Sequence, residues 1–182
     1  NQKEQAICYI GGMTQIRGLE ELVDSMERVP AAKLHIAGGY SPSSFKDVLA
    51  ARKGWKQVVE HGYVSRKETN QIMSQSKVGV VTFLPLPNHI DAQPNKMFEY
   101  MSAGIPVVGS HFPLWKAIIE ANNCGLCVDP NNPTEIANAV NHLLANDAEA
   151  QQMGLNGRKI VLEKYNWSIE QQKLVEIYKS IW

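Results

Sequence analysis

Short apolar runs alternate with amphipathic segments along almost the whole chain, and this alternation constrains the fold more than any other feature. The expected strands cover residues 6–10, 33–38, 57–62, 78–84, 105–110 and 125–129. Most of these runs are apolar at consecutive positions, which is typical of strands covered on both faces. Between them lie helical patterns, such as Leu19, Leu22, Val23 and Met26. The alternation predicts an α/β fold: a doubly wound parallel sheet of about six strands, followed by C-terminal helices.

The length and the tail predict one domain with an appendage. The chain has 182 residues, 44% of them apolar, enough for one core. Residues 1–182 are therefore taken as one domain, and residues 151–182 as a helical tail. The tail is interrupted near residues 164–168, where Ser168 is expected to cap the last helix. Its apolar end, Ile181 and Trp182, indicates packing on a partner.

Charge and cysteine content exclude several classes. Lys+Arg and Asp+Glu both number 18, and this balance disfavours a nucleic-acid-binding protein. No apolar run is long enough to span a bilayer. Three cysteines, an odd number, favour a reducing compartment, so a cytoplasmic location is expected. Cys124 and Cys127 have redox or zinc spacing, but there is no second pair, so we expect strand packing and no metal site.

Ligands of doubly wound sheets bind beyond the carboxyl ends of the strands, so the loops there carry most weight. The first such loop is "GGMTQIRG", residues 11–18, which is neither a dinucleotide fingerprint nor a P-loop. The chain also contains no Asp-x-Asp. Gly11 and Gly12 permit close backbone approach, and Arg17 can bind phosphate bidentately. A turn with a solvated arginine fits this loop equally well.

The stretch "DAQPNKMFEYMSAGIPVVGS", residues 91–110, places charged residues at a loop-to-helix junction before a strand. If a helix begins near Asn95, the free N–H groups of its first turn form an anion site. At about 100° per residue, one face carries Met97, Phe98 and Met101, and the opposite one Lys96, Glu99, Tyr100 and Ala103. We expect the first face in the core. The alternative for the second is a solvated pair of Lys96 and Glu99.

The same stretch resembles the signature of the retaining glycosyltransferases of the GT-B fold, the large family 4. That signature is a carboxylate, seven residues and a glutamate, then "GxPVV", which here corresponds to Asp91, Glu99 and residues 104–108. The stretch "PNKMFEYMSAG" is similar to the corresponding sequences of the family's branch that builds surface polysaccharides. Further matches cover nearly the whole chain: "YIGG…IRG", "LHIAGG", "VVEHGYVS", "CGLCVDPNNPTEIANAV" and "YNWS".

The resemblance implies roles for individual residues. Glu99 would accept hydrogen bonds from ribose hydroxyls, and Asp91 would hold a hydroxyl of the donor sugar. Arg17, with Lys96 as second candidate, would balance the diphosphate leaving group in place of a metal. The remaining nucleotide contacts would come from Gly11, Gly12 and Asn95 near the phosphates, from Gly38 and Gly39 in a thin loop, and from the backbone near Tyr63 and Val64 at the base.

Some positions depart from the family pattern. Asp91 is one methylene shorter than the usual glutamate, which shortens its reach to the sugar. Gly12 stands where the family often has an arginine, and Lys116 lies near the position of a frequent glutamate.

All the matches belong to the donor-binding, carboxyl-terminal half of such enzymes. The resemblance therefore implies a donor domain that binds a UDP-sugar or GDP-sugar and needs no other cofactor. The acceptor, a glycan or lipid-linked sugar, would bind through a missing amino-terminal domain, on which the tail would pack. The fragment alone would be inactive, and the full-length enzyme could be peripheral to a membrane. Two alternatives remain open: a GT-B sugar-nucleotide epimerase domain, and a non-catalytic nucleotide-binding module.

Overall fold

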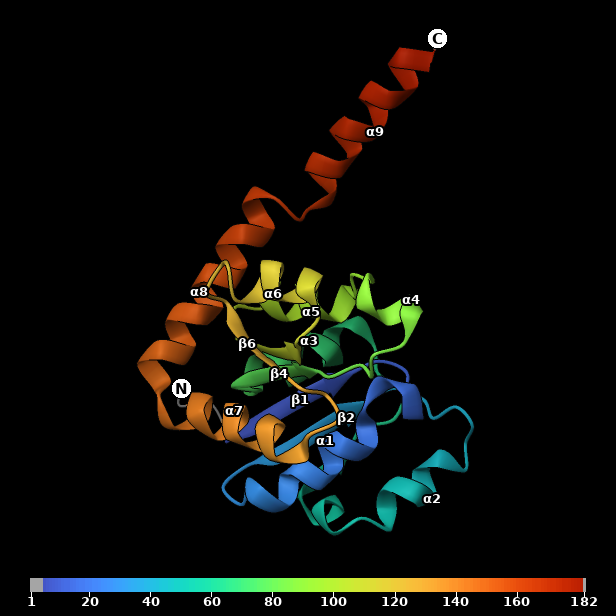
Figure 1. Ribbon diagram of the computed structural model, residues 1–182, viewed down its shortest axis with the longest axis vertical. Coiled ribbons are helices and arrows are strands. Elements are labelled where there is room, and N and C mark those ends of the chain that lie inside the picture. The colour runs from blue at the N-terminus through green and yellow to red at the C-terminus, as the bar shows by residue number, and fades with distance from the viewer. Residues whose placement is uncertain (1–4, 182) are drawn as a thin grey trace.

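The computed structural model describes residues 5–181 and shows a parallel six-stranded sheet between two layers of helices (Figure 1). The strands are β1 (Ala6–Ile10), β2 (Lys33–Ala37), β3 (Val58–Glu60), β4 (Val78–Val81), β5 (Val107–Ser110) and β6 (Gly125–Val128). Their order is β3-β2-β1-β4-β5-β6, and every pair is parallel. This order reverses direction between β1 and β4, which is the switch point of a doubly wound sheet. The expected fold class is thus confirmed.

Helices cover both faces of this sheet. They are η1 (Gln15–Arg17), α1 (Leu19–Ser25), η2 (Met26–Arg28), α2 (Phe45–Ala50), η3 (Lys53–Gln57), α3 (Arg66–Gln75), α4 (Pro87–Ile90), α5 (Asn95–Ser102), α6 (Pro113–Ile119), α7 (Pro133–Ala145), α8 (Asp147–Glu163) and α9 (Trp167–Ile181). Figure 1 shows α1 and α7 on one face and α3, α5 and α6 on the other. Successive strand residues point to opposite faces, so Ile7 and Tyr9 join the α1–α7 core while Cys8 joins the other.

The helix starts follow local sequence chemistry. Ser65 accepts a hydrogen bond from the backbone N–H of Glu68, whose carboxylate accepts one from the backbone N–H of Ser65, as a capping box requires. At α7, Asn132 accepts from two first-turn N–H groups and Pro133 occupies the first helical position. The capping box at Ser65 starts α3 directly after the loop that follows β3.

One close approach anchors α5 to the sheet. Tyr100 of α5 is fully buried, and a Cβ atom at Gly79 of β4 would overlap its ring. The missing side chain lets the ring lie flat on β4 and lets its hydroxyl accept a 3.0 Å hydrogen bond from the backbone N–H of Ile10. The helix is therefore tied to both strands of the switch point.

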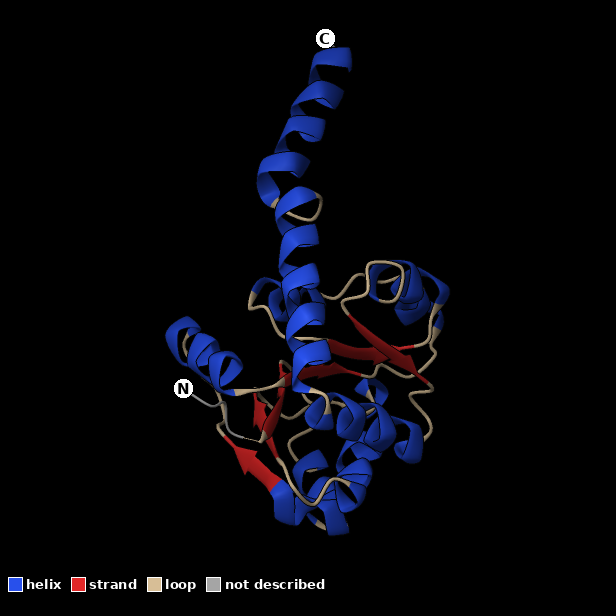
Figure 2. Ribbon diagram, turned by 90° about the vertical axis from the view of Figure 1, so that its left-hand side faces the viewer, coloured by secondary structure: helices blue, strands red, loops and turns tan. Residues whose placement is uncertain are grey.

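The predicted tail is two elements with different surroundings. α8 packs on α5, α7 and β6, and its buried residues are Ala150, Met153, Gly154, Gly157 and Val161. α9 projects from the domain, and none of its described residues is buried (Figures 1 and 2). The expectation that Ser168 caps α9 is wrong, because the helix begins at Trp167 and the side chain of Asn166 accepts from the N–H of Ile169. Packing of the tail on another domain stays a prediction, and it now concerns α9.

The helices of residues 5–181 include none with both the length and the apolar character needed to cross a bilayer.

The contact between Gly79 and Tyr100 predicts a context-dependent substitution. Gly79→Ala is expected to lower the free energy of unfolding by about 1–3 kcal/mol, because the added methyl group must displace a packed ring. Urea unfolding measures the change. In a Tyr100→Leu background the same substitution should cost less, since the ring is absent. An equal cost in both backgrounds would show that Tyr100 is not the cause.

Candidate functional site

A pocket of about 400 Å³ opens at the switch point, at the carboxyl ends of β1 and β4. Its lining residues are Ile10, Gly11, Arg17, Phe83, Ala92, Gln93, Pro94, Asn95, Lys96 and Glu99. Five predicted site residues therefore meet in one cavity, although they come from segments some eighty positions apart. Parallel strands bring their carboxyl ends to a common edge, and this geometry unites the segments.

The backbone at this edge is unusually close-packed. Gly11 and Gly38 have φ values of 136° and 139°, which favour glycine. A Cβ atom at Gly38 would collide with the carbonyl oxygen of Gly11. The N–H of Gly11 donates to Ala37 O at 2.8 Å, and that of Gly38 donates to Gly62 O at 2.7 Å. The loops after β1, β2 and β3 therefore form one continuous backbone surface, over which a ligand can approach the sheet.

Lys96 is the most unusual group of the pocket. It is buried, and its Nζ atom has no hydrogen-bond partner among residues 5–181. The ammonium lies 3.8 Å from the ring centroid of Tyr9 and 5.2 Å from that of Phe83. Burial, and then the nearby charge of Arg17, lower the pKa of Lys96 to about 7, against a smaller opposing effect of Glu99. An amine that becomes positive on protonation is thus held at the cavity, and no anion is hydrogen-bonded to it among the described residues.

The position of Lys96 corrects the expected helix faces of α5. Lys96 and Tyr100 are buried together with Met97 and Met101, whereas Phe98 is only partly buried. The expected core face is confirmed for Met97 and Met101, and Phe98 packs against the same core. The opposite face is buried as well at two positions: Lys96 lies over the rings of Tyr9 and Phe83, and Tyr100 lies over Gly79. A solvated pair of Lys96 and Glu99 is excluded, because the carboxylate of Glu99 pairs with a different residue, Arg66.

Arg17 closes the other side of the pocket. Its Nη1 donates a 2.9 Å hydrogen bond to Gly12 O, which also accepts the hydroxyl of Tyr9 at 2.8 Å. A Cβ atom at residue 12 would lie 2.8 Å from Nη1, so Gly12 leaves room for the guanidinium. The guanidinium stands 5.6 Å from the ring centroid of Phe83. Two cationic side chains therefore share one aromatic partner and border one cavity.

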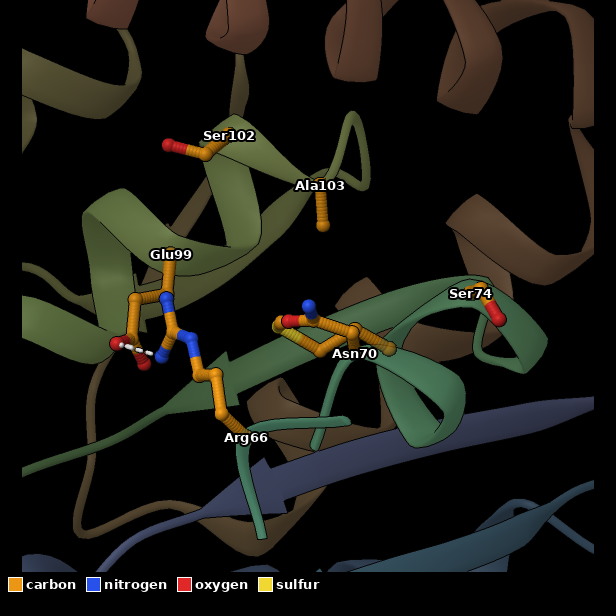
Figure 3. Close-up of a pocket in the computed structure, with 7 residues that line it drawn as sticks. Arg66, Asn70, Ser74, Glu99, Ser102 and Ala103 are labelled. Carbon is orange, nitrogen blue, oxygen red and sulfur yellow. Dashed lines mark hydrogen bonds and ion pairs between the residues drawn. The ribbon is translucent and has the colours of Figure 1, made fainter. Parts of the chain in front are cut away.

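Glu99 is held by a residue that the sequence analysis did not consider. Nη1 of Arg66, the first residue of α3, lies 2.6 Å from Oε1 of Glu99, and Figure 3 shows the guanidinium turned toward the carboxylate. A second pocket, of about 330 Å³, lies between α3 and α5 and is lined by Arg66, Asn70, Met73, Ser74, Glu99, Ser102 and Ala103. The sequence did carry one signal for Arg66: it directly follows the loop after an expected strand, where ligand-binding residues of such sheets lie.

The residues expected near a base lie at the far end of the same edge. Tyr63 is 90% exposed, and its hydroxyl occupies the space that a side chain at Gly39 would need. Val64 packs against the α5-side core. Gly39, Tyr63 and Val64 do not line the 400 Å³ pocket. Gly38 is hydrogen-bonded to Gly62, and a Cβ atom there would meet Gly11, so Gly38 lies between these residues and the pocket. The backbone surface described above connects them.

Asp91 is exposed and ends α4, outside the lining of the pocket. Its chain neighbours Ala92 and Gln93 do line it, and Gln93 is a polar residue that the sequence analysis did not select. The role of Asp91 in holding a sugar stays a prediction.

Cys124 and Cys127 are packed side chains rather than reactive thiols. Cys124 and Cys127 are free thiols, and burial raises their pKa values to about 11 and about 12. Thiols with such pKa values are protonated and unreactive at neutral pH. Within the described part of the chain, no cluster of three or more His, Cys, Asp or Glu side chains could hold a metal ion.

The low pKa of Lys96 predicts how stability depends on pH. Between pH 7 and 10.5 the unfolded chain binds more protons than the native one, so the contribution of Lys96 to the free energy of unfolding rises with pH across this range. Lys96→Met should therefore stabilise the fold at pH 6.5 by on the order of 3 kcal/mol, and the gain should shrink toward pH 10. Urea unfolding at both values measures this. Met at the exposed Lys67 is the control, and an equal gain there would contradict the explanation.

Comparison with known proteins agrees with this geometry. Residues 4–146 match the family described as glycosyl transferases, group 1. An uncharacterized glycosyltransferase of Methanocaldococcus jannaschii is 30% identical over 180 residues, which are 97% of this chain and 45% of that protein. The chain spans less than half the length of the relatives that it matches from end to end.

Solved structures share the fold. Sucrose-phosphate synthase from Thermosynechococcus elongatus superposes with a TM-score of 0.86 at 24% identity, over 98% of this chain and 45% of the other. The HepE protein of Anabaena, solved in complex with UDP, superposes with a TM-score of 0.85 at 17% identity, over 98% of this chain and 49% of the other. The Rossmann-like architecture expected from the sequence is confirmed by these similarities. The family match over most of the residues, together with the relative at 30% identity, shows that this chain belongs to the group 1 glycosyltransferases.

Proposed function

We propose that this chain is the donor-binding half of a retaining glycosyltransferase that transfers a sugar from a UDP-sugar or GDP-sugar to an acceptor, in surface polysaccharide synthesis. One observation carries the proposal: the buried ammonium of Lys96 and the guanidinium of Arg17 border one cavity at the switch point of the sheet. Two cations with no metal-binding cluster beside them, in the part of the chain that the structure describes, suit a diphosphate.

The diphosphate would lie at the start of α5. This helix begins at Asn95, and no side chain of the described residues caps its first turn. The amide N–H groups of Asn95 and Lys96 are therefore available to a bound anion, and the helix dipole favours negative charge there. As the bond to the sugar breaks, charge builds up on the diphosphate, and Lys96 and Arg17 would stabilise it electrostatically. The missing side chains of Gly11 and Gly12 leave room for the two cations themselves, since a Cβ atom at either position would lie 2.8 Å from Lys96 Nζ or Arg17 Nη1.

The ribose and base would extend from there toward β3. Glu99 lies four residues after Asn95, about 6 Å further along the helix, which suits the step from a diphosphate to a ribose. Its carboxylate can accept hydrogen bonds from ribose hydroxyls. β3 lies two strands from β1, about 10 Å away. A base could reach the backbone at Tyr63 and Val64 over the thin loop of Gly38 and Gly39.

The donor sugar and the acceptor complete the proposal. Asp91, on the segment that leads into the pocket, would hold a sugar hydroxyl. The acceptor, a glycan or lipid-linked sugar, would enter from an amino-terminal domain, without which this chain binds its donor but does not turn it over. The projecting helix α9 exposes large apolar side chains that would pack on that domain: Trp167, Leu174, Val175, Ile177, Tyr178 and Ile181.

Isothermal titration with UDP and GDP tests the proposal directly. We expect one of the two to bind, and Glu99→Ala to weaken it by about 1.5–3 kcal/mol, the scale of hydrogen bonds to a charged group. The matched control is Glu27→Ala, an exposed carboxylate on η2 that precedes β2 and so lies at the opposite edge of the sheet. Failure of both UDP and GDP to bind, or equal effects of the two substitutions on binding, would refute the proposal.

The same site should take up a proton when it binds a diphosphate. At pH 8 most Lys96 side chains are neutral, since the pKa is about 7. A bound anion favours the charged form and raises this pKa, so binding should absorb a substantial fraction of one proton and weaken as pH rises above 7. Titrations at pH 8 in two buffers of different ionisation enthalpy measure the uptake. Lys96→Met should abolish it, and uptake that persists in this variant would contradict the assignment.

A further inference from the structure

The ion pair between Arg66 and Glu99 bridges two helices at the edge of the proposed ribose site. Nη1 of Arg66 and Oε1 of Glu99 are 2.6 Å apart, and the side chains are 67% and 30% exposed (Figure 3). Arg66 donates to Oε1 of Glu99, so Oε2 keeps its lone pairs for other donors. An exposed ion pair of this kind adds little to stability. Its main effect is on the position of the Glu99 carboxylate.

Glu99 has three directions available to it. It borders the 400 Å³ pocket, the 330 Å³ pocket between α3 and α5, and a third cavity of about 660 Å³ toward Tyr165 and Trp167. A glutamate with three rotatable bonds and partial exposure would distribute itself among them and lose that freedom on binding. The contact with Arg66 selects the direction toward α3, which is the side on which the loop with Tyr63 and Val64 lies.

The backbone of Arg66 is well placed to make this selection. It directly follows Ser65, whose capping box with Glu68 secures the first turn of α3. Asn70 and Ser74, one and two turns further along α3, line the same 330 Å³ pocket as Arg66 (Figure 3). The side chain therefore reaches Glu99 from a fixed helix start.

We propose that Arg66 is a positioning residue that orients the carboxylate of Glu99 toward the ribose hydroxyls and so sets the preference for ribonucleotides. This inference rests on the proposed function, and it adds a residue to which that function assigns no role. Arg66 also offsets the negative charge of Glu99, which would otherwise repel a diphosphate one helical turn away. Removal of the Arg66 side chain should therefore weaken the binding of all nucleoside diphosphates somewhat, and the binding of those with ribose hydroxyls more.

The test compares affinities with and without those hydroxyls. UDP and GDP are titrated first, and the tighter of the two is then compared with its 2′,3′-dideoxy analogue. The wild type should prefer the ribonucleotide by about tenfold or more. Arg66→Ala should reduce this ratio about three- to tenfold, because Glu99 must then be ordered by the ligand itself. Arg66→Lys, which keeps the charge, should retain most of the preference.

Two controls separate positioning from general effects. Lys67→Ala removes an exposed positive charge from the neighbouring position of α3 and should leave the ratio unchanged. In a Glu99→Gln background, Arg66→Ala should cause no further change in the ratio, since both act through one carboxylate.

The outcomes are distinguishable. Failure of the wild type to bind UDP or GDP refutes the proposed function and, with it, the role of Arg66. Binding with a ratio that Arg66→Ala leaves unchanged refutes the positioning role alone. A ratio that increases in Arg66→Ala also refutes it, because Arg66 would then compete with ribose for Glu99.

Discussion

The contact of Tyr100 with the strands of the switch point is the interaction on which the rest of the site depends. The ring lies over Gly79, and the hydroxyl accepts from the backbone of Ile10, so α5 is tied to β4 and β1 at once. Lys96 lies one turn before this anchor and Glu99 directly precedes it. The backbone positions of both charged residues follow from this packing contact, since the regular geometry of a helix fixes the turns next to an anchored turn.

The second constraint is electrostatic. The chain as a whole has no net charge, yet two cations border a cavity at one edge of the sheet. Keeping an ammonium buried without a counterion costs stability, and the protein retains one where the rings of Tyr9 and Phe83 offset part of that cost. Such an arrangement is typical of functional sites, where a bound ligand supplies the counter-charge that the protein lacks.

Particular residues show how far sequence reasoning reached. The positions of the six strands and the start of α5 at Asn95 follow from short-range patterns, and the structure agrees. On α5 the core positions Met97 and Met101 were predicted, but the burial of Lys96 and Tyr100 was not, because a helical period tells which residues share a side but not how many sides meet protein. Arg66 was missed since its partner lies 33 positions away. The cap of α9 was placed at Ser168 instead of Asn166, within the usual uncertainty of helix ends.

The sequence by itself determined the alternation of strands and helices, and hence the parallel sheet whose carboxyl edge collects the glycines and charged residues. These features depend on local periodicity and on backbone preferences, which a single segment expresses without its neighbours. Only the tertiary structure decided that Lys96 is buried against aromatic rings and that Arg66 holds Glu99. Burial and pairing depend on which segments meet in space, and these contacts join residues too far apart in the chain for any local pattern to record.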